Sequence, residues 1–154
     1  MYQRILVPVD GSPTSNAGLD EALMLAQAGG AQMLLMHVVD EMPFIMGAEG
    51  YGAVSGDVFD LLKEAGEKIL ADAKAHVEKS GMAAETRLFD SFGGRLCEQV
   101  APPVPDWGAD LIVLGTHGRR GARRMLLGSD AEQVLRTATV PVLLVRSAKT
   151  APAP

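Results

Sequence analysis

The chain alternates short, continuously apolar runs with longer segments in which apolar residues recur every three or four positions. A run that is apolar throughout is typical of a parallel strand covered on both faces, and a spacing of three or four is typical of an amphipathic helix. This pattern predicts five strands, at residues 5–9, 33–39, 85–90, 111–114 and 142–145. Because helical segments separate the strands, we expect one doubly wound parallel sheet with crossover helices.

Start and stop signals bound the first two predicted helices. Ser12 and Pro13 supply an N-cap and a first-turn proline, and the glycine pair 29–30 ends this helix. A long helix is predicted over 57–79, before the stop signal of Gly81. The residues between the second strand and this helix have no clean period, so a loop is expected there.

Proline dominates the segment before the fourth predicted strand. A short helix over 95–101 is expected to end at 102–105, because proline lacks an N–H and clashes with the preceding turn. An irregular connection is expected through 106–108. The last helix is predicted over 129–137, with Leu135 on its buried face, and Ser129 and Glu132 in it have the spacing of a capping box.

The most informative motif follows the fourth strand. It begins with Gly115-Thr-His-Gly118 and, nine residues later, ends at Gly128-Ser129. A strand that opens into glycines and then a helix is a common way to hold phosphate, because backbone N–H groups and the positive end of the helix dipole face the ligand. The spacing matches neither a Walker A loop nor the Rossmann fingerprint. Of the four arginines in this segment, Arg119 is the best phosphate candidate, since a guanidinium can pair two oxygens at once.

This motif resembles the nucleotide loop of the universal stress protein family, in its ATP-binding branch. Three further segments resemble that family in its order: residues 5–12 its first strand and acidic turn, 34–38 its second strand, and 140–145 its last. The resemblance implies a single α/β domain over 1–147 with a doubly wound five-stranded parallel sheet in the order 3-2-1-4-5, of the adenine nucleotide alpha hydrolase type. Residues 148–154 are expected to be a disordered tail.

The resemblance implies ATP with Mg²⁺ as the ligand. It places the nucleoside beside the turn of Pro8, Val9 and Asp10, and the adenine edge against the backbone of Val38. The residues that it places around the ribose and phosphates are Leu114, Gly115, Gly118, Arg119, Gly128, Ser129 and Asp130. Asp130 departs from the small or apolar residue frequent in the family. Its carboxylate would suit the start of a helix or a divalent metal, but it would oppose phosphate without one.

Several of these residues also have a structural interpretation. Asp10 can be a turn residue whose carboxylate accepts local amides, and Ser129 can be a helix cap. His37 is interpreted as a strand residue, His76 as a solvated helix residue and Cys97 as a buried apolar side chain.

The motifs leave three classes of function open. The preferred hypothesis is an ATP-binding stress-response regulatory protein whose nucleotide-bound state partners read, because the phosphate loop is complete and catalytic groups are not evident. A slow ATPase or a phosphoryl or nucleotidyl transferase would have to rely on Asp10, Asp130 or His117. A module that interacts with proteins and has lost the nucleotide is the third possibility.

Composition and charge narrow the setting. The 154 residues fit one domain, and a net charge of −5 argues against non-specific nucleic-acid binding. No signal-peptide pattern or apolar run of about 20 residues is present, and the single cysteine cannot form an intramolecular disulfide, so a cytoplasmic location is expected. The strand at Val142–Val145 would form a sheet edge, which predicts a homodimer, as the resemblance also implies.

Overall fold

The fold was analysed in a computed structural model, which describes residues 1–39, 56–90, 96–116 and 127–146. The elements in chain order are β1 (Arg4–Pro8), α1 (Pro13–Gly29), β2 (Gln32–Val38), α3 (Gly56–Lys79), β3 (Ala84–Phe89), α4 (Leu96–Val100), α5 (Pro103–Trp107), β4 (Leu111–Gly115), α6 (Ser129–Thr137) and β5 (Val142–Val145). Most of the predicted loop after β2 and all of the predicted tail lie outside these residues.

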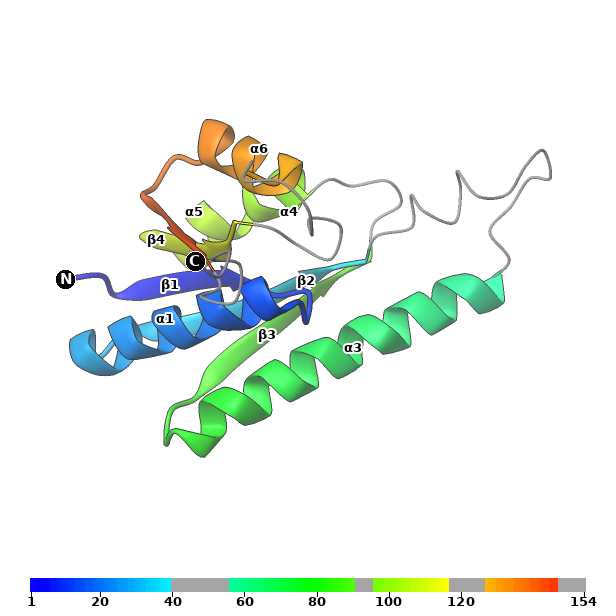
Figure 1. Ribbon diagram of the computed structural model, residues 1–154, viewed down its shortest axis with the longest axis horizontal. Helices are drawn as coiled ribbons and strands as arrows, with labels where there is room; N and C mark the ends of the chain where they lie inside the picture. The colour runs from blue at the N-terminus through cyan, green and yellow to red at the C-terminus, as the bar shows by residue number, and fades with distance from the viewer. Residues whose placement is uncertain (40–55, 91–95, 117–126, 147–154) are drawn as a thin grey trace, which may run out of the picture.

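The five strands form one parallel sheet in the order β3-β2-β1-β4-β5, which confirms the predicted topology (Figure 1). The first three strands each begin one residue earlier than predicted. Arg4 and Gln32, for example, are paired with each other although both are exposed. The backbone forms the ladder whatever the side chain, so an apolar pattern alone misses polar residues at strand ends.

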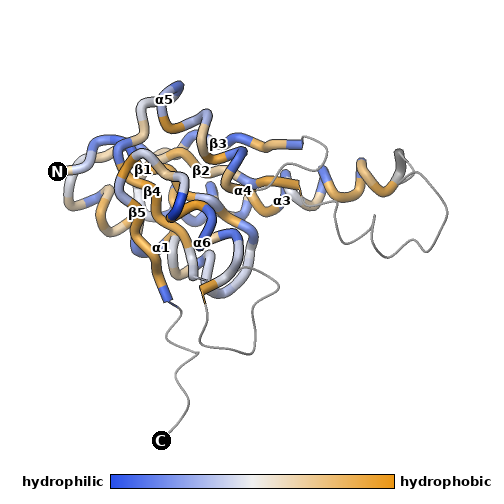
Figure 2. The backbone as a smooth tube through the Cα atoms, turned by 90° about the horizontal axis from the view of Figure 1, so that it is seen from above, coloured by the Kyte–Doolittle hydropathy of each residue, from blue (hydrophilic) through white to orange (hydrophobic). Residues whose placement is uncertain are grey.

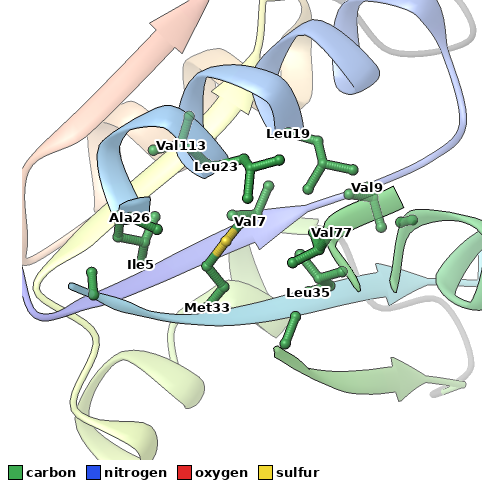
Figure 3. Close-up of a cluster of buried hydrophobic side chains, with 14 of the residues drawn as sticks. Ile5, Val7, Val9, Leu19, Leu23, Ala26, Met33, Leu35, Val77 and Val113 are labelled. Carbon is green, nitrogen blue, oxygen red and sulfur yellow. The ribbon is translucent and has the colours of Figure 1, made fainter. Parts of the chain in front are cut away.

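Helices cover both faces of the sheet. The helices α1 and α3 lie on one face, and α4, α5 and α6 lie on the other (Figure 1). The inner strands β2, β1 and β4 are predominantly hydrophobic, whereas the edge strand β3 also carries polar residues (Figure 2). Side chains alternate along each strand, so that Ile5 and Val7 point toward α1 and α3 whereas Leu6 points to the opposite layer. Figure 3 shows the cluster of buried side chains between the sheet and the helices α1 and α3, in which Leu19 and Leu23 of α1 pack on the sheet.

Local signals explain how α1 begins and ends. The side chain of Ser12 accepts a hydrogen bond from the Ser15 N–H, Pro13 occupies the first turn, and Gly30 ends the helix with a left-handed φ of 67°. These are the cap, the first-turn proline and the glycine stop that the sequence predicts.

The prediction of an irregular connection through 106–108 is wrong. The helix α4 does end at Val100, but the prolines then begin α5 rather than an irregular segment. Pro103 and Pro105 occupy first-turn positions, where an N–H has no acceptor within the helix, so proline costs no hydrogen bond there. Gly108 then ends the helix with a φ of 75°.

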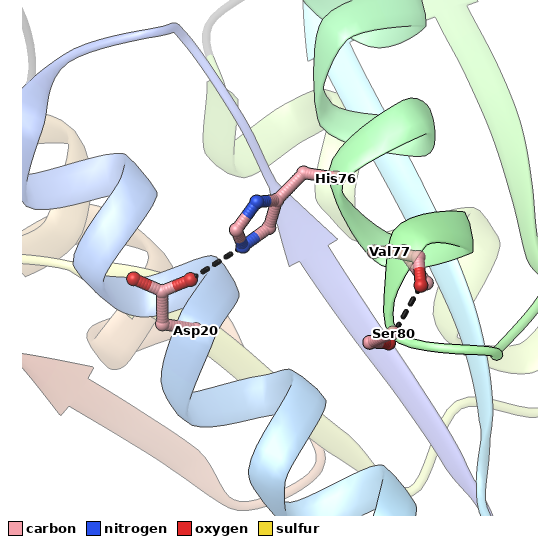
Figure 4. A network of polar contacts seen from close by, with 4 residues as sticks. All are labelled: Asp20, His76, Val77 and Ser80. Carbon is pink, nitrogen blue, oxygen red and sulfur yellow. Dashed lines mark hydrogen bonds and ion pairs between the residues drawn. The ribbon is translucent and has the colours of Figure 1, made fainter.

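Three further side chains differ from expectation. Cys97 of α4 is half-buried rather than buried, and its Sγ donates to Oε1 of Gln133 at 3.2 Å. Leu135 of α6 is 48% exposed rather than buried, whereas Val134 beside it is buried. His76 of α3 is not merely solvated, because its Nε2 lies 2.6 Å from Oδ1 of Asp20 in α1 (Figure 4). This pair joins the two helices that cover the same face of the sheet.

Within the part of the chain that the structure describes, no helix is both long and apolar enough to cross a membrane.

Candidate functional site

The ladder between β1 and β4 stops before either strand ends. Its last pair is Leu6 with Ile112, whereas β1 pairs with β2 as far as Pro8. In the order 3-2-1-4-5, β1 and β4 are the neighbours at which the chain reverses its direction across the sheet. Ligands of doubly wound folds bind outside the carboxyl ends of the strands at such a place, which we call the switch point.

Pro8 explains where this ladder stops. The carbonyl of Arg4 accepts the N–H of Asp110 on the β4 side at 2.9 Å, and the N–H of Val9 donates to the carbonyl of Met36 in β2 at 2.8 Å. Because consecutive residues of a strand direct their backbone groups to opposite neighbours, Pro8 faces β4. It has no N–H to donate, so the next rung cannot form. The predicted site residue Pro8 therefore separates β1 from β4 at the switch point.

The turn from β1 to α1 is held by three short-range hydrogen bonds. The Ser12 N–H donates to Oδ1 of Asp10 at 2.9 Å, and the Ser15 N–H donates to the Ser12 hydroxyl at 3.2 Å. The Asp10 N–H donates to the Ser15 hydroxyl at 3.1 Å. Gly11 between them has a φ of 75°, which favours glycine. The turn interpretation of Asp10 is confirmed, and its half-buried carboxylate is held in a defined orientation beside the switch point.

Gly115 ends β4 against the first turn of α1. A Cβ atom at Gly115 would lie 2.6 Å from the carbonyl oxygen of Thr14 and 3.0 Å from the backbone nitrogen of Ser15. Gly18, one turn further along α1, allows the same close approach, because its Cβ position is 3.2 Å from the nitrogen of Gly115. The two glycines bring the α1 N-terminus and the β4 C-terminus into backbone contact, so the predicted nucleoside and phosphate sides of the site adjoin.

The two ends of the glycine-rich segment are tied together. The carbonyl of Thr116 accepts the N–H of Gly128 at 2.8 Å, and the Thr116 N–H donates to the carbonyl of Val145 in β5 at 2.9 Å. Residues 117–126, including the predicted ligands Gly118 and Arg119, lie outside the described residues. Their attachment points are nevertheless fixed at the end of β4 and at the start of α6.

The predicted capping box at the start of α6 is not formed. Gly128 is the N-cap, and its carbonyl accepts the N–H of Glu132, so Ser129 is the first helical residue. Glycine at the N-cap has no side chain to satisfy the first-turn N–H groups, which lack acceptors within any helix. Ser129 and Asp130 are exposed at this end of the helix. The sequence missed this because Gly-Ser can place either residue at the cap.

The remaining predicted positions also lie at the carboxyl ends of strands. Leu114 is buried in the layer beneath α6, next to Gly115. Val38 is half-buried at the end of β2. Met36 directs its carbonyl to Val9, so Val38, two residues later, directs its backbone groups to the same side, past the end of β1. This is the orientation that the predicted contact with an adenine edge needs.

Negative charge lies near the α6 N-terminus. Asp130 and Glu132 are both in the first turn, where the helix dipole favours carboxylates. Glu132 also pairs with Arg136, one turn on, at 2.8 Å. Among residues 1–39, 56–90, 96–116 and 127–146, no group of three or more His, Cys, Asp and Glu side chains is placed to hold a metal ion.

Sequence reasoning assigned no role in the site to Ser15 and His37. Ser15 accepts the Asp10 N–H, and the buried His37 ring lies with Nδ1 2.6 Å from the carbonyl oxygen of Val9. A signal for His37 was present, because it is a polar residue inside an otherwise apolar strand, and a buried polar group requires a partner. Which partner it finds depends on the order of the strands.

Comparisons with known proteins agree with this fold. The chain is 35% identical to universal stress protein MJ0531 of Methanocaldococcus jannaschii over 150 residues, which cover 97% of this chain and 85% of that protein. The solved structure of hypothetical protein MJ0577 from the same organism has a TM-score of 0.79 and 27% identity, and the match covers 95% of this chain and 96% of that one. A universal stress protein from Archaeoglobus fulgidus, solved in complex with dAMP, shares the fold, with a TM-score of 0.67, 21% identity and coverage of 94% and 98%.

The family assignment spans nearly the entire sequence. Residues 1–146 match the universal stress protein family, and they contain every strand and helix described above. The chain belongs to the universal stress protein family.

Proposed function

We propose that this chain is an ATP-binding regulatory protein of the stress response, whose nucleotide-bound state is read by partner proteins. The observation that carries the proposal is the switch point itself, where Pro8 ends the β1–β4 ladder and Gly115 brings β4 against α1. The A. fulgidus protein in complex with dAMP supports it, since this fold can hold an adenine nucleotide. The proposal includes a cytoplasmic location, because a single cysteine cannot form an intramolecular disulfide and so does not call for an oxidising compartment.

The proposal places the triphosphate at the N-terminus of α6, and two features of the described residues there support this. First-turn N–H groups there are free of intrahelical acceptors, and the dipole places partial positive charge at the same end. The carboxylate of Asp130 opposes a bare phosphate, but it would attract Mg²⁺, whose positive charge would offset the negative charge of the phosphates. Magnesium is commonly held by one or two carboxylates together with substrate phosphates, so Asp130 would suffice as its protein ligand. In this proposal Gly118 and Arg119 complete the phosphate contacts, and Asp10 and Val38 face the nucleoside.

The proposal includes a homodimer formed through β5. This strand lies at the edge of the sheet and its four residues, all apolar, are half-buried. Carbonyls of Pro141 and Val145 accept N–H groups of Ile112 and Thr116 on the β4 side. The backbone groups of Val142 and Leu144 therefore point outward, where a second copy of the strand can pair with them. Because Thr116 bonds to β5, a dimer interface there would be linked directly to the phosphate loop.

The test is direct identification and titration of the nucleotide. Protein purified under native conditions is denatured and the released small molecules are separated; an adenine nucleotide close to one per chain is expected. Nucleotide-free protein is then titrated calorimetrically with ATP and with GTP, each with and without Mg²⁺. We expect saturable binding of ATP that strengthens with Mg²⁺ and exceeds binding of GTP. Absence of saturable ATP binding with Mg²⁺ present would refute the proposal.

The same preparation separates a regulatory protein from an enzyme. ATP is incubated with an excess of protein over nucleotide. The regulatory proposal expects this ATP to be recovered unchanged over the time in which a partner would read the bound state. Turnover that Asp130→Asn abolishes would instead establish the alternative of a slow ATPase, with Asp130 positioning the metal or the attacking water.

A further inference from the structure

The peptide group between Val9 and Asp10 is held from both ends by side chains. On one side, the His37 ring in β2 donates from Nδ1 to the carbonyl of Val9 across 2.6 Å. On the other, the N–H of Asp10 donates to the hydroxyl of Ser15 in α1 across 3.1 Å. A single peptide plane at the end of β1 is thus fixed by two neighbouring elements. No other rotation of this plane would satisfy both partners at once.

The hydrogen bond to Val9 fixes which nitrogen of the buried His37 ring carries the proton. A carbonyl oxygen accepts and never donates, so the proton of this hydrogen bond is carried by Nδ1 of His37. The ring is 8% exposed, and Ser15 is 6% exposed, so water does not readily replace either side chain. Loss of either partner would leave a peptide group of the turn without its hydrogen bond in a buried setting.

The helix α3 packs against the edge of the His37 ring that carries Cδ2 and Nε2. A Cβ atom at Gly66 would lie 2.8 Å from Cδ2 and 3.3 Å from Nε2 of His37. The absence of a side chain at Gly66 therefore allows the helix backbone to approach the ring. His37 is confined between Val9 and α3, which fixes the position of the ring as well as its hydrogen bond.

We propose that His37 and Ser15 are positioning residues that fix the Val9–Asp10 peptide and so preorganise Asp10 for the nucleoside half of the ligand. The inference rests on the proposed function and extends it, because it assigns residues that do not themselves contact the nucleotide. A carboxylate that is already oriented binds more tightly than one that must be ordered on binding. The His37 ring also contacts α3, so a displacement of α3 would shift the ring and with it the Val9–Asp10 peptide.

Three substitutions at His37 separate this role from simple filling of space. In His37→Asn the amide nitrogen is attached to the same carbon as Nδ1 is in histidine, so a donor to Val9 is kept. His37→Gln places its nitrogen one bond further out, and His37→Leu fills the space with no donor. Ser15→Ala removes the acceptor on the other side of the same peptide, and Ser15→Thr keeps it.

The readout is calorimetric affinity for ATP and for AMP, with folding followed by urea denaturation. We expect His37→Leu, His37→Gln and Ser15→Ala each to weaken ATP and AMP by the same factor, about tenfold, which corresponds to about 1.4 kcal/mol. His37→Asn and Ser15→Thr are expected to bind within about threefold of wild type, a difference of about 0.65 kcal/mol. An equal effect on both nucleotides places the defect at the part that the two ligands share, the nucleoside with its first phosphate, and not at the two terminal phosphates.

A second measurement does not depend on affinity. Hydrogen exchange of the Asp10 amide, followed by NMR, is expected to speed up in His37→Leu and Ser15→Ala and to stay slow in His37→Asn. If wild type binds ATP and His37→Leu binds it as tightly, or if asparagine restores nothing, the positioning role is overturned while the proposed function stands. If wild type binds no adenine nucleotide, the proposed function fails and this extension fails with it.

Discussion

The carbonyl oxygen of Thr14 lies 2.6 Å from the position that a Cβ atom would occupy at Gly115. The first turn of α1 and the last residue of β4 are therefore in backbone contact at the switch point. Real Cβ atoms do not come this close to a backbone oxygen, so any other residue at 115 would force α1 and β4 apart. Glycine is required here by packing, before any ligand is considered.

Replacing Gly115 by alanine should destabilise the fold. Because the neighbouring atoms belong to the backbone rather than to a flexible side chain, we expect Gly115→Ala to lower the free energy of unfolding by about 1–3 kcal/mol. Urea denaturation followed by circular dichroism measures this.

The matched control for this substitution is Gly29→Ala, at the last residue of α1. A Cβ at Gly29 would lie 3.0 Å from Cγ and Sδ of Met1, which is 92% exposed and can move aside, and at an ordinary contact distance of 3.6 Å from the Tyr2 carbonyl oxygen. We expect this control to be neutral within about 0.5 kcal/mol. Equal losses in the two variants would contradict the packing argument for Gly115.

Gly115 also shows what the sequence can and cannot reveal. The glycine pattern predicts that a phosphate approaches the backbone at Gly115, and this stays a prediction, whereas the structure shows a different close neighbour, the backbone of Thr14. Thr14 and Gly115 are about 100 residues apart in sequence, and only the strand order brings them together. The alternating apolar runs and helical segments predicted a doubly wound parallel sheet, and the resemblance to the universal stress protein family supplied the strand order that the structure confirms.

The errors in prediction have similar causes. The pairing of His76 with Asp20 depends on how α1 and α3 lie beside each other, which periodicity does not specify. The proline-rich segment predicts the end of a helix, yet proline is also compatible with the first turn of a helix, and Pro103 and Pro105 lie in the first turn of α5. Residue type alone does not distinguish a helix that ends at proline from one that begins there.

Replacing Ser129 by alanine should weaken ATP binding without weakening the fold. Ser129 is the first residue of α6 and not its cap, so removing the hydroxyl is expected to change the free energy of unfolding by less than about 0.5 kcal/mol. If the hydroxyl holds a terminal phosphate, ATP affinity falls about fivefold to tenfold, through one lost hydrogen bond of about 1 kcal/mol, while AMP affinity is unchanged. Calorimetry and urea denaturation of the same preparation give both numbers.

Ser12→Ala is the matched control for this prediction. The hydroxyl of Ser12 does cap a helix, accepting the Ser15 N–H, so its removal should cost about 1 kcal/mol of stability. A loss of that size in Ser129→Ala would show that Ser129 acts as a cap after all. Unchanged ATP affinity in Ser129→Ala would remove this residue from the proposed phosphate site.

The contact of His76 with Asp20 should contribute little to stability. Their side chains are 52% and 60% exposed, so solvent screens the attraction and the coupling is expected to be about 0.2–1 kcal/mol. A double-mutant cycle with His76→Ala and Asp20→Ala, measured by urea denaturation, gives this coupling energy directly. Coupling well above this range would mean that α1 and α3 depend on the pair for their alignment.

Proline at position 142 should prevent dimerisation without disrupting the sheet. The N–H of Val142 points away from β4, because the neighbouring Pro141 directs its carbonyl to Ile112. Proline is tolerated at the first residue of an edge strand, so Val142→Pro is expected to fold, but it lacks the N–H that a second β5 strand would bind. Sedimentation velocity at micromolar concentration should therefore show a dimer for the wild type and a monomer for this variant.

Leu143→Pro tests the same backbone from the other side. Residue 143 pairs with Val113, and its N–H faces β4, so proline there removes a ladder bond within the chain and is expected to cost about 1–3 kcal/mol of stability. The two variants introduce proline at adjacent positions, and they differ in the side chain that is replaced and in the direction of the lost N–H. A wild-type monomer, or a Val142→Pro protein that still dimerises, would show that β5 is not the interface. If Val142→Pro is monomeric and also binds ATP more weakly, dimer formation and ATP binding are coupled, and the hydrogen bond from Thr116 to Val145 is a contact that joins β5 to the phosphate loop.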